Sequence, residues 1–135
     1  MVYVTRRERF SAAHRLFNPA LSDEENFKLY GLCSNPNWHG HNYIIEVVVC
    51  GEVDPNTGYL LDLKVLKEII RKNVIEKVDH KNLNIETDFM KGIIPSAENI
   101  AAAIWKQLAN KIPKGKLYSI KLYETENNYF EYKGE

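Results

Sequence analysis

Two histidines separated by one glycine, His39 and His41, are the residues in this chain best suited to chemistry. On a β-strand the side chains alternate between two faces, so both imidazoles would leave the same face. Gly40 between them has no side chain, which lets another segment approach closely. Two adjacent imidazoles make half a metal site; the alternative is that they are polar strand residues with no metal. The spacing therefore predicts a metal site that needs a third ligand.

The third ligand must come from the two other histidines, His14 and His80. His14 follows an expected first strand and is preceded by small residues, whereas His80 follows Asp79, which suits a role in proton transfer better. Three neutral imidazoles with no fourth protein ligand are typical of catalytic zinc, which keeps one coordination position open. We therefore expect His14, together with His39 and His41, to bind a zinc ion.

Cys33 lies six residues before the histidine pair, next to a turn containing Pro36, and is a candidate base or nucleophile. A thiol acts in either role only as thiolate, which a neighbouring imidazole such as His80, oriented by Asp79, would favour. The alternative for a lone cysteine is a small buried apolar residue. We interpret Cys50, which follows three valines, in that way and Cys33 as functional.

Two carboxylates have alternative interpretations. Glu124 follows Ile120 and Leu122 on an expected inward face, so it lies either in solvent at the strand end or towards a ligand. A carboxylate aimed at a ligand would accept two parallel hydrogen bonds from an amino-heterocycle. Glu98 lies in the first turn of an expected helix, where an acid interacts favourably with the helix dipole; a ligand role is the alternative.

Alternating and helical patterns predict the elements that position these groups. β-branched runs and period-two alternation favour strands, while capping residues followed by apolar residues at helical spacing favour helices. With no β-α-β alternation, the order of elements predicts an α+β fold of antiparallel hairpins with two helices on one face. The expected strands are residues 3–10, continued through a bend at 12–13 towards His14, then 41–53 and 59–62 as a hairpin, then 117–124 and 129–132; the expected helices are 22–31 (a short helix or ordered loop), 62–74 and 96–112.

Composition sets the broad class. The 135 residues suffice for one domain with a real core, spanning 1–135, and 44% hydrophobic with 27% charged residues is typical of a globular chain. Eighteen basic and eighteen acidic residues cancel, so there is no basic excess of the kind that nucleic-acid or membrane-surface binding requires. No apolar run approaches the ~20 residues that span a bilayer. Without a secretory signal pattern, and with two cysteines, the chain is expected to be cytoplasmic and reduced.

Four motifs follow one another along the chain: Gly31–Tyr43, Asp79–Leu83, Ser96–Asn99 and Tyr123–Asn128. Together they resemble the 6-pyruvoyl-tetrahydropterin synthase family, and the similarity runs from about residue 10 to the last residue. The resemblance implies the tunnelling fold, a four-stranded antiparallel sheet with two helices on one face. Three subunits would close a barrel and two trimers would stack into a homohexamer, with sites between subunits.

The resemblance also implies an activity, a zinc-dependent lyase of tetrahydrobiopterin biosynthesis. Such an enzyme converts 7,8-dihydroneopterin triphosphate to 6-pyruvoyl-tetrahydropterin with loss of triphosphate. It would hold one zinc ion per subunit, and magnesium is associated with activity in the family. Carried over by motif, the zinc ligands would be His14, His39 and His41, the general base Cys33, its relay Asp79 and His80, and the anchor of the pterin ring Glu124.

Two departures and two alternative functions accompany the resemblance. Trp38 stands where the family often has glycine, and Ala97 where threonine is common. The related 6-carboxytetrahydropterin synthase of queuosine biosynthesis acts on the same substrate but usually has three residues between the cysteine and the first histidine. Here there are five, residues 34–38, which favours the pyruvoyl-forming enzyme. A non-catalytic module that binds zinc and pterin is the other alternative, and Cys33 argues against it because simple binding needs no thiolate.

Overall fold

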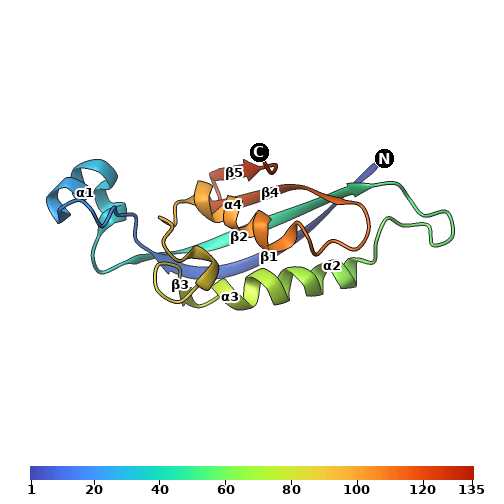
Figure 1. Ribbon diagram of the computed structural model, residues 1–135, viewed down its shortest axis with the longest axis horizontal. Coiled ribbons are helices and arrows are strands. Elements are labelled where there is room, and N and C mark those ends of the chain that lie inside the picture. The colour runs from blue at the N-terminus through green and yellow to red at the C-terminus, as the bar shows by residue number, and fades with distance from the viewer.

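The computed structural model describes residues 1–135, in which a five-stranded sheet carries helices on one face (Figure 1). The strand order is β3-β1-β2-β4-β5, and the four long strands pair in antiparallel fashion. The elements are β1 (Val2–His14), α1 (Asp23–Tyr30), the 3₁₀ turn η1 (Gly31–Ser34), β2 (His39–Gly51), α2 (Leu63–Ile70), the π-helical turn η2 (Arg71–Ile75), α3 (Glu76–Val78), β3 (Lys81–Asn82), the 3₁₀ turn η3 (Asp88–Met90), α4 (Ala97–Leu108), β4 (Lys116–Thr125) and β5 (Asn128–Tyr132).

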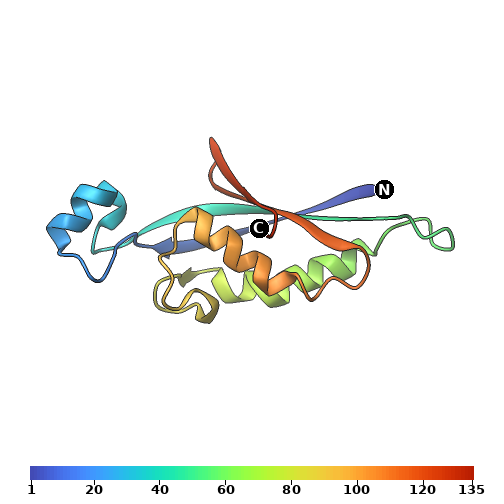
Figure 2. The ribbon, with the colours of Figure 1, turned by 45° about the horizontal axis from the view of Figure 1, so that its top comes forward.

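The helices and the sheet share one apolar layer. Figure 2 shows α2 and α4 side by side beneath the same face of the sheet. Alternate residues of β2 and β4 point into that layer, and every third or fourth residue of the helices meets them, as amphipathic elements require. The fully buried members include Ile45, Val47, Ile120 and Leu122 from the strands and Leu66, Ile70, Ile100 and Ile104 from the helices.

The predicted helices form at the predicted caps. The Ser22 side chain accepts a hydrogen bond from the Glu25 amide while the Glu25 side chain accepts one from the Ser22 amide, and Gly31 ends the helix with φ of 63°. Asp62 and Ser96 cap α2 and α4. The helix that begins after Asp62 runs further than expected, through η2 and α3 as far as Val78. None of the helices is long and apolar enough to cross a membrane.

Three expectations about strands were wrong in detail. Residues 59–62 form no returning strand, because β2 is already paired along both edges: Gly51 lies opposite Val2 of β1, and Cys50 opposite Lys116 of β4. Leu60 and Leu61 are instead buried in the core. The first strand has no bend at residues 12–13, since β1 pairs with β2 at every position up to His14. The sheet is also not the expected purely antiparallel one of four strands, because the two-residue strand β3, which was not predicted, lies parallel to β1.

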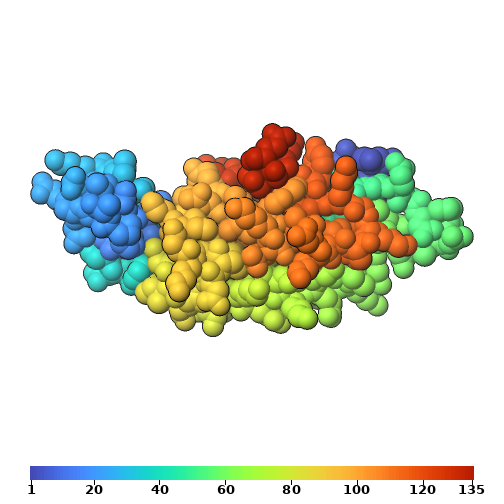
Figure 3. All heavy atoms as spheres, in the orientation of Figure 1, coloured from blue at the N-terminus to red at the C-terminus, as the bar shows by residue number.

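One segment stands apart from this layered body. Residues 15–38, which we call the α1 lobe, project from one end of the molecule and include α1 and η1 (Figure 3). The lobe leaves β1 directly after His14 and returns to β2 directly before His39. Its two ends therefore meet at the histidines that the sequence singled out.

Candidate metal centre and catalytic groups

The antiparallel pairing of β1 with β2 brings three histidines together. His14 lies opposite His39, and His41 lies opposite Ala12, so all three side chains leave the same face of the sheet. The ring centroid of His14 is 4.5 Å from that of His39 and 5.2 Å from that of His41, and the two β2 rings are 5.0 Å apart. One nitrogen from each ring lies within 4.8 Å of the others, close enough to be gathered by one metal ion.

The hydrogen bonds of these rings leave nitrogens free for a metal. His14 is 1% exposed, and its Nδ1–H donates to the Pro95 carbonyl at 2.8 Å. Its Nε2 therefore carries a lone pair, which only the Tyr43 hydroxyl contacts, at 3.4 Å. A carbonyl that fixes the tautomer in this way is a common partner of metal-binding histidines. His39 Nδ1 and His41 Nε2 are buried without any hydrogen-bond partner. Orphaned buried nitrogens of this kind are rare in folded proteins, and a metal ion would satisfy them.

Burial also keeps the rings neutral. It lowers the pKa of His14 to about 4, against the opposing effect of the hydrogen bond that the ring donates to the Pro95 carbonyl, and the neighbouring rings of His39 and His41 lower it further. The pKa of His39 is lowered by burial and then by His41, while Glu124 acts in the opposite direction. Both imidazoles are therefore neutral near pH 7, the form in which histidine binds metals. The donor set, its free nitrogens and its protonation all fit a zinc ion with an open position.

Glu124 lies beside this triad. Leu122, two residues earlier on β4, pairs with Ile45 of β2, which lies on the same face as His39 and His41. Because residues two apart on a strand share a face, Glu124 also lies on the face that carries the histidines. One carboxylate oxygen is 4.0 Å from His14 Nε2 and the other 3.9 Å from His41 Nε2. The side chain is 27% exposed, so the carboxylate is open to a ligand as well as close to the triad.

Tyr43 is a site residue that the sequence reasoning missed. It continues the alternation of His39 and His41 on β2, stacks on Phe10, and is fully buried beside His14 and His41. Burial raises the pKa of its phenol, and the negative charges of Glu124 and Cys33 raise it further, so the group stays neutral. The period-two pattern of the strand was the signal that would have found it.

Cys33 is an exposed thiol on η1 within the α1 lobe. The Leu16 amide donates to the Cys33 carbonyl at 2.8 Å, and Arg15 Nε donates to the Ser34 carbonyl at 2.7 Å. These bonds tie η1 to the segment that follows His14. The thiol itself is exposed and makes no hydrogen bond.

Asp79 and His80 form the expected pair on the edge of the sheet. His80 Nδ1 and an Asp79 carboxylate oxygen are 3.0 Å apart. The Ser11 amide donates to the other oxygen at 2.9 Å, and the His80 amide donates to the Ser11 carbonyl at 2.7 Å. The Ser11 amide and then His80 hold the pKa of Asp79 below its usual value. The pair is thus anchored to β1 as a rigid unit, with His80 in the left-handed region at φ of 59°.

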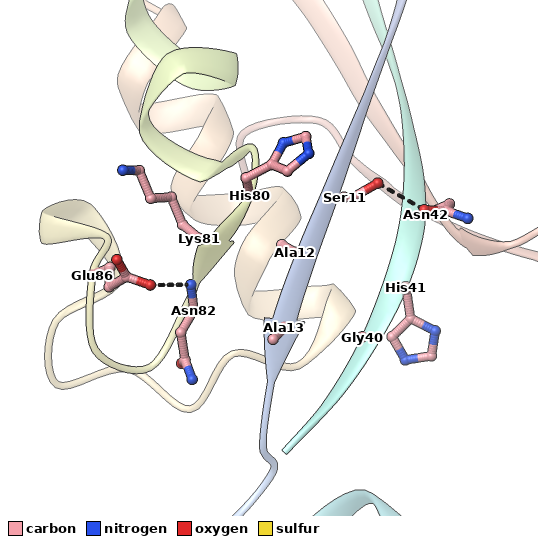
Figure 4. Close-up of a pocket in the computed structure, with 10 residues that line it drawn as sticks. All are labelled: Ser11, Ala12, Ala13, Gly40, His41, Asn42, His80, Lys81, Asn82 and Glu86. Carbon is pink, nitrogen blue, oxygen red and sulfur yellow. Dashed lines mark hydrogen bonds between the residues drawn. The ribbon is translucent and has the colours of Figure 1, made fainter. Parts of the chain in front are cut away.

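The His80 imidazole faces outward. Its side chain is 83% exposed and lines a pocket of about 450 Å³ with Ser11, Asn42 and Lys81 (Figure 4). No hydrogen bond joins Cys33 to His80 or Asp79 within the chain. The structure therefore brings together the triad and Glu124, and separately Asp79 and His80, while Cys33 lies apart from both groups on the α1 lobe.

Glu98 makes no polar contact with the candidate site. It is exposed in the first turn of α4 and makes no hydrogen bond or ion pair, so its surroundings fit an acid at a helix start.

Trp38 has an unusual backbone conformation, with a φ of 69°. This left-handed conformation is free for glycine and costs other residues roughly 1–2 kcal/mol. The glycine that the resemblance implies at this position would adopt this conformation without strain, whereas this chain places tryptophan there.

Comparison with known proteins agrees with the fold. The family model described as 6-pyruvoyl tetrahydropterin synthase matches residues 3–135. The 6-pyruvoyl tetrahydrobiopterin synthase of Homo sapiens is 48% identical over 98% of this chain and 91% of its own length. That of Dictyostelium discoideum is 46% identical over 99% of this chain and 97% of its own length.

A solved structure extends the similarity to three dimensions. The 6-pyruvoyl tetrahydropterin synthase of Caenorhabditis elegans superposes with a TM-score of 0.93 at 41% identity, covering 99% of this chain and 96% of its own. The chain belongs to the 6-pyruvoyl tetrahydropterin synthase family.

Proposed function

We propose that this protein is a zinc-dependent 6-pyruvoyl-tetrahydropterin synthase. It converts 7,8-dihydroneopterin triphosphate to 6-pyruvoyl-tetrahydropterin and inorganic triphosphate, an internal redox rearrangement with elimination in which no atom is added. The observation that carries the proposal is the triad of His14, His39 and His41, buried or half-buried with free nitrogens beside one carboxylate. The high identity to synthases along nearly the whole chain supports the same reaction.

Zinc held by the three histidines would supply a Lewis acid that increases the acidity of the substrate's side-chain hydroxyl and C–H groups. Glu124 orients the substrate, because its two oxygens accept parallel hydrogen bonds from the amino-pyrimidine N–H groups. Cys33, as thiolate, takes up and returns the protons that move during the rearrangement, a contribution of about 10²–10⁴-fold. Magnesium would accompany the triphosphate, whose oxygens are the ligands it prefers.

A complete site needs two copies of the chain. Cys33 is exposed on the α1 lobe, whereas the Asp79–His80 pair faces outward at the sheet edge and makes no hydrogen bond to Cys33. An exposed relay and an exposed thiol complement each other when one subunit presents its sheet edge to the lobe of another. Leu32, next to Cys33, is 82% exposed, which fits a contact surface at this point. We therefore propose the homohexamer, a dimer of trimers, with sites between subunits.

Turnover of dihydroneopterin triphosphate by wild-type protein and by Cys33→Ala tests the function. The wild type should release triphosphate and form a product with the mass of 6-pyruvoyl-tetrahydropterin. The Cys33→Ala variant should retain zinc and pterin binding but lose turnover by at least about 10²-fold. Equal turnover would reject Cys33 as the base, and release of acetaldehyde would reassign the protein to the carboxy-forming reaction. Absence of turnover in the zinc-loaded wild type would leave a binding module.

A further inference from the structure

The α1 lobe has few links to the body of the protein. Asn84, in the loop after β3, forms both hydrogen bonds that join them: the Arg15 amide donates to its Oδ1 at 2.9 Å, and its Nδ2 donates to the Arg15 carbonyl at 2.9 Å. The other polar contacts of the lobe are internal, such as Arg15 with Asp23 and the Asn26 side chain with the Asn18 carbonyl. These two hydrogen bonds hold the lobe at one residue only. They do not fix its orientation relative to the body, which must depend on other contacts.

Apolar side chains of the lobe and of the body face one another at the half-buried Trp38. Trp38 and Phe17 of the lobe line a pocket of about 230 Å³ together with Ile85 and Ile93 of the body. The pocket therefore marks the junction between lobe and body. On its body side the wall includes Ile94, which precedes the residue whose carbonyl orients the His14 ring. The loop before α4 therefore contributes both to the junction, through Ile94, and to the candidate metal site, through the Pro95 carbonyl.

Trp38 occupies this junction in a strained conformation. Its φ of 69° directly precedes His39, the first ligand candidate on β2. The Trp38 amide donates to the Asn35 carbonyl at 3.0 Å, closing the turn that leads from η1 into the strand. Backbone strain of this kind persists where the surroundings over-determine it, and it concentrates at functional sites. Here the half-buried indole occupies space at the junction that a glycine at the same position would leave empty.

We infer that Trp38 is a positioning residue, whose indole at the junction sets the direction of the α1 lobe and thereby the place of the Cys33 thiol relative to the histidine triad. Its catalytic consequence rests on the proposed function, whereas its effect on the lobe does not. Glycine at position 38 would remove the strain and the indole together, and alanine would remove the indole but keep the strain. Comparing the two separates the contribution of packing from that of strain.

Hydrogen exchange of the backbone amides, measured on the full chain loaded with zinc, tests the effect on the lobe. Exchange in residues 18–34 should accelerate roughly tenfold or more in both Trp38→Gly and Trp38→Ala, because the lobe loses its apolar support. Trp38→Phe should remain close to wild type. Trp105→Phe, which alters an indole packed on Tyr132 and far along the chain from the lobe, is the matched control. Unchanged exchange in both Trp38→Gly and Trp38→Ala would overturn the inference.

Kinetics and metal analysis test the consequence for catalysis. With zinc content unchanged and the pterin still held by Glu124, we expect kcat to fall roughly tenfold or more in Trp38→Gly while KM changes little, since a small misplacement of a reacting group is costly. Trp38→Phe should restore kcat. A merely structural role would alter thermal stability without separating kcat from KM, and that result would reject positioning. If the wild type has no turnover, the proposed function fails while the exchange experiment still decides the role of Trp38.

Discussion

At the scale of single residues, the metal centre depends on which nitrogen of each histidine is free. The Pro95 carbonyl assigns the His14 proton to Nδ1, and burial keeps that ring neutral. Glu124, 3.9 Å from His41 Nε2, adds a negative charge without a hydrogen bond to the triad. The residues thus divide into neutral donors for a cation and one charged acceptor for a ligand, and this division leads to two predictions.

The free energy of unfolding of the metal-free protein should fall as the pH is lowered from 6.5 to 4. The pKa of His14 is about 4 in the folded protein against 6.5 when unperturbed, so between these values the unfolded chain binds a proton that the folded chain does not. The loss should approach about 3 kcal/mol. Urea unfolding across this pH range measures it, and His14→Gln should flatten the slope. An equally steep slope in the variant would exclude His14 as its source.

Replacing Glu124 by glutamine should weaken pterin binding without releasing zinc. The amide retains one acceptor but presents an N–H₂ group to the substrate's donors, and loss of the ionic acceptor should raise KM roughly tenfold or more. Steady-state kinetics and metal analysis measure the two effects. Glu126→Gln, in the β4–β5 turn, is the control and should match the wild type. Loss of zinc in Glu124→Gln would instead make Glu124 a metal ligand.

At the scale of elements, the register of β1 against β2 builds the site. His14 opposite His39 and Ala12 opposite His41 leave Gly40 facing the opposite side, where a Cβ would lie 3.3 Å from the Ala12 carbonyl oxygen. A side chain at position 40 would therefore push the two strands apart between the ligands. Glycine at position 40 lets β1 and β2 lie close together, and this strand separation sets the distance between His14 and the two histidines of β2.

Gly40→Ala should therefore lower zinc affinity about tenfold, since a shift of the strands misplaces the ligand nitrogens. The control is Gly58→Ala, which forces alanine to a φ of 81° in the turn before α2. It should cost stability of about 1 kcal/mol while leaving zinc affinity unchanged. Competition with a chelator measures affinity, and thermal unfolding measures stability. Wild-type zinc affinity in Gly40→Ala would show that the strands tolerate the added methyl group.

At the scale of the whole molecule, the separation of Cys33 from Asp79 and His80 determines the kind of assembly that works. The pair is anchored to β1 through Ser11, and the thiol belongs to the projecting lobe. No hydrogen bond joins the pair to the thiol within the chain, so under the proposed mechanism a neighbouring subunit brings them together. The proposed hexamer, with sites between subunits, would meet that need.

Mixing two inactive variants should restore activity. Cys33→Ala lacks the base, and His80→Asn lacks the relay but keeps a residue that tolerates the left-handed conformation. Co-refolded in equal amounts, they should regain about a quarter of wild-type activity, because one site in four would combine an intact thiol with an intact relay from different subunits. Each variant refolded alone is the control. No recovery in mixed assemblies of the correct size would place both groups of a working site in one chain.

Most of the predicted elements are present because their signals are local. The capping box at Ser22, the cap at Asp62 and the β-branched run of β2 act over a few residues, and each formed as expected. The segment 59–62 failed because its signal competed with a non-local one: both edges of β2 were already occupied by β1 and β4. The two-residue strand β3 has too little sequence to predict and exists through its pairing with β1.

The sequence alone determined the types of groups available: imidazoles on one face of a strand, a thiol beside a turn, an acid next to a histidine, and helices with apolar stripes. These follow from the periodicity of the backbone, which any short segment carries within itself. Only the tertiary structure decided that His14 meets His39, that Glu124 lies beside them, and that His80 turns outward. Such distances depend on strand register and chain packing, which join residues far apart in the sequence and are encoded by no single segment.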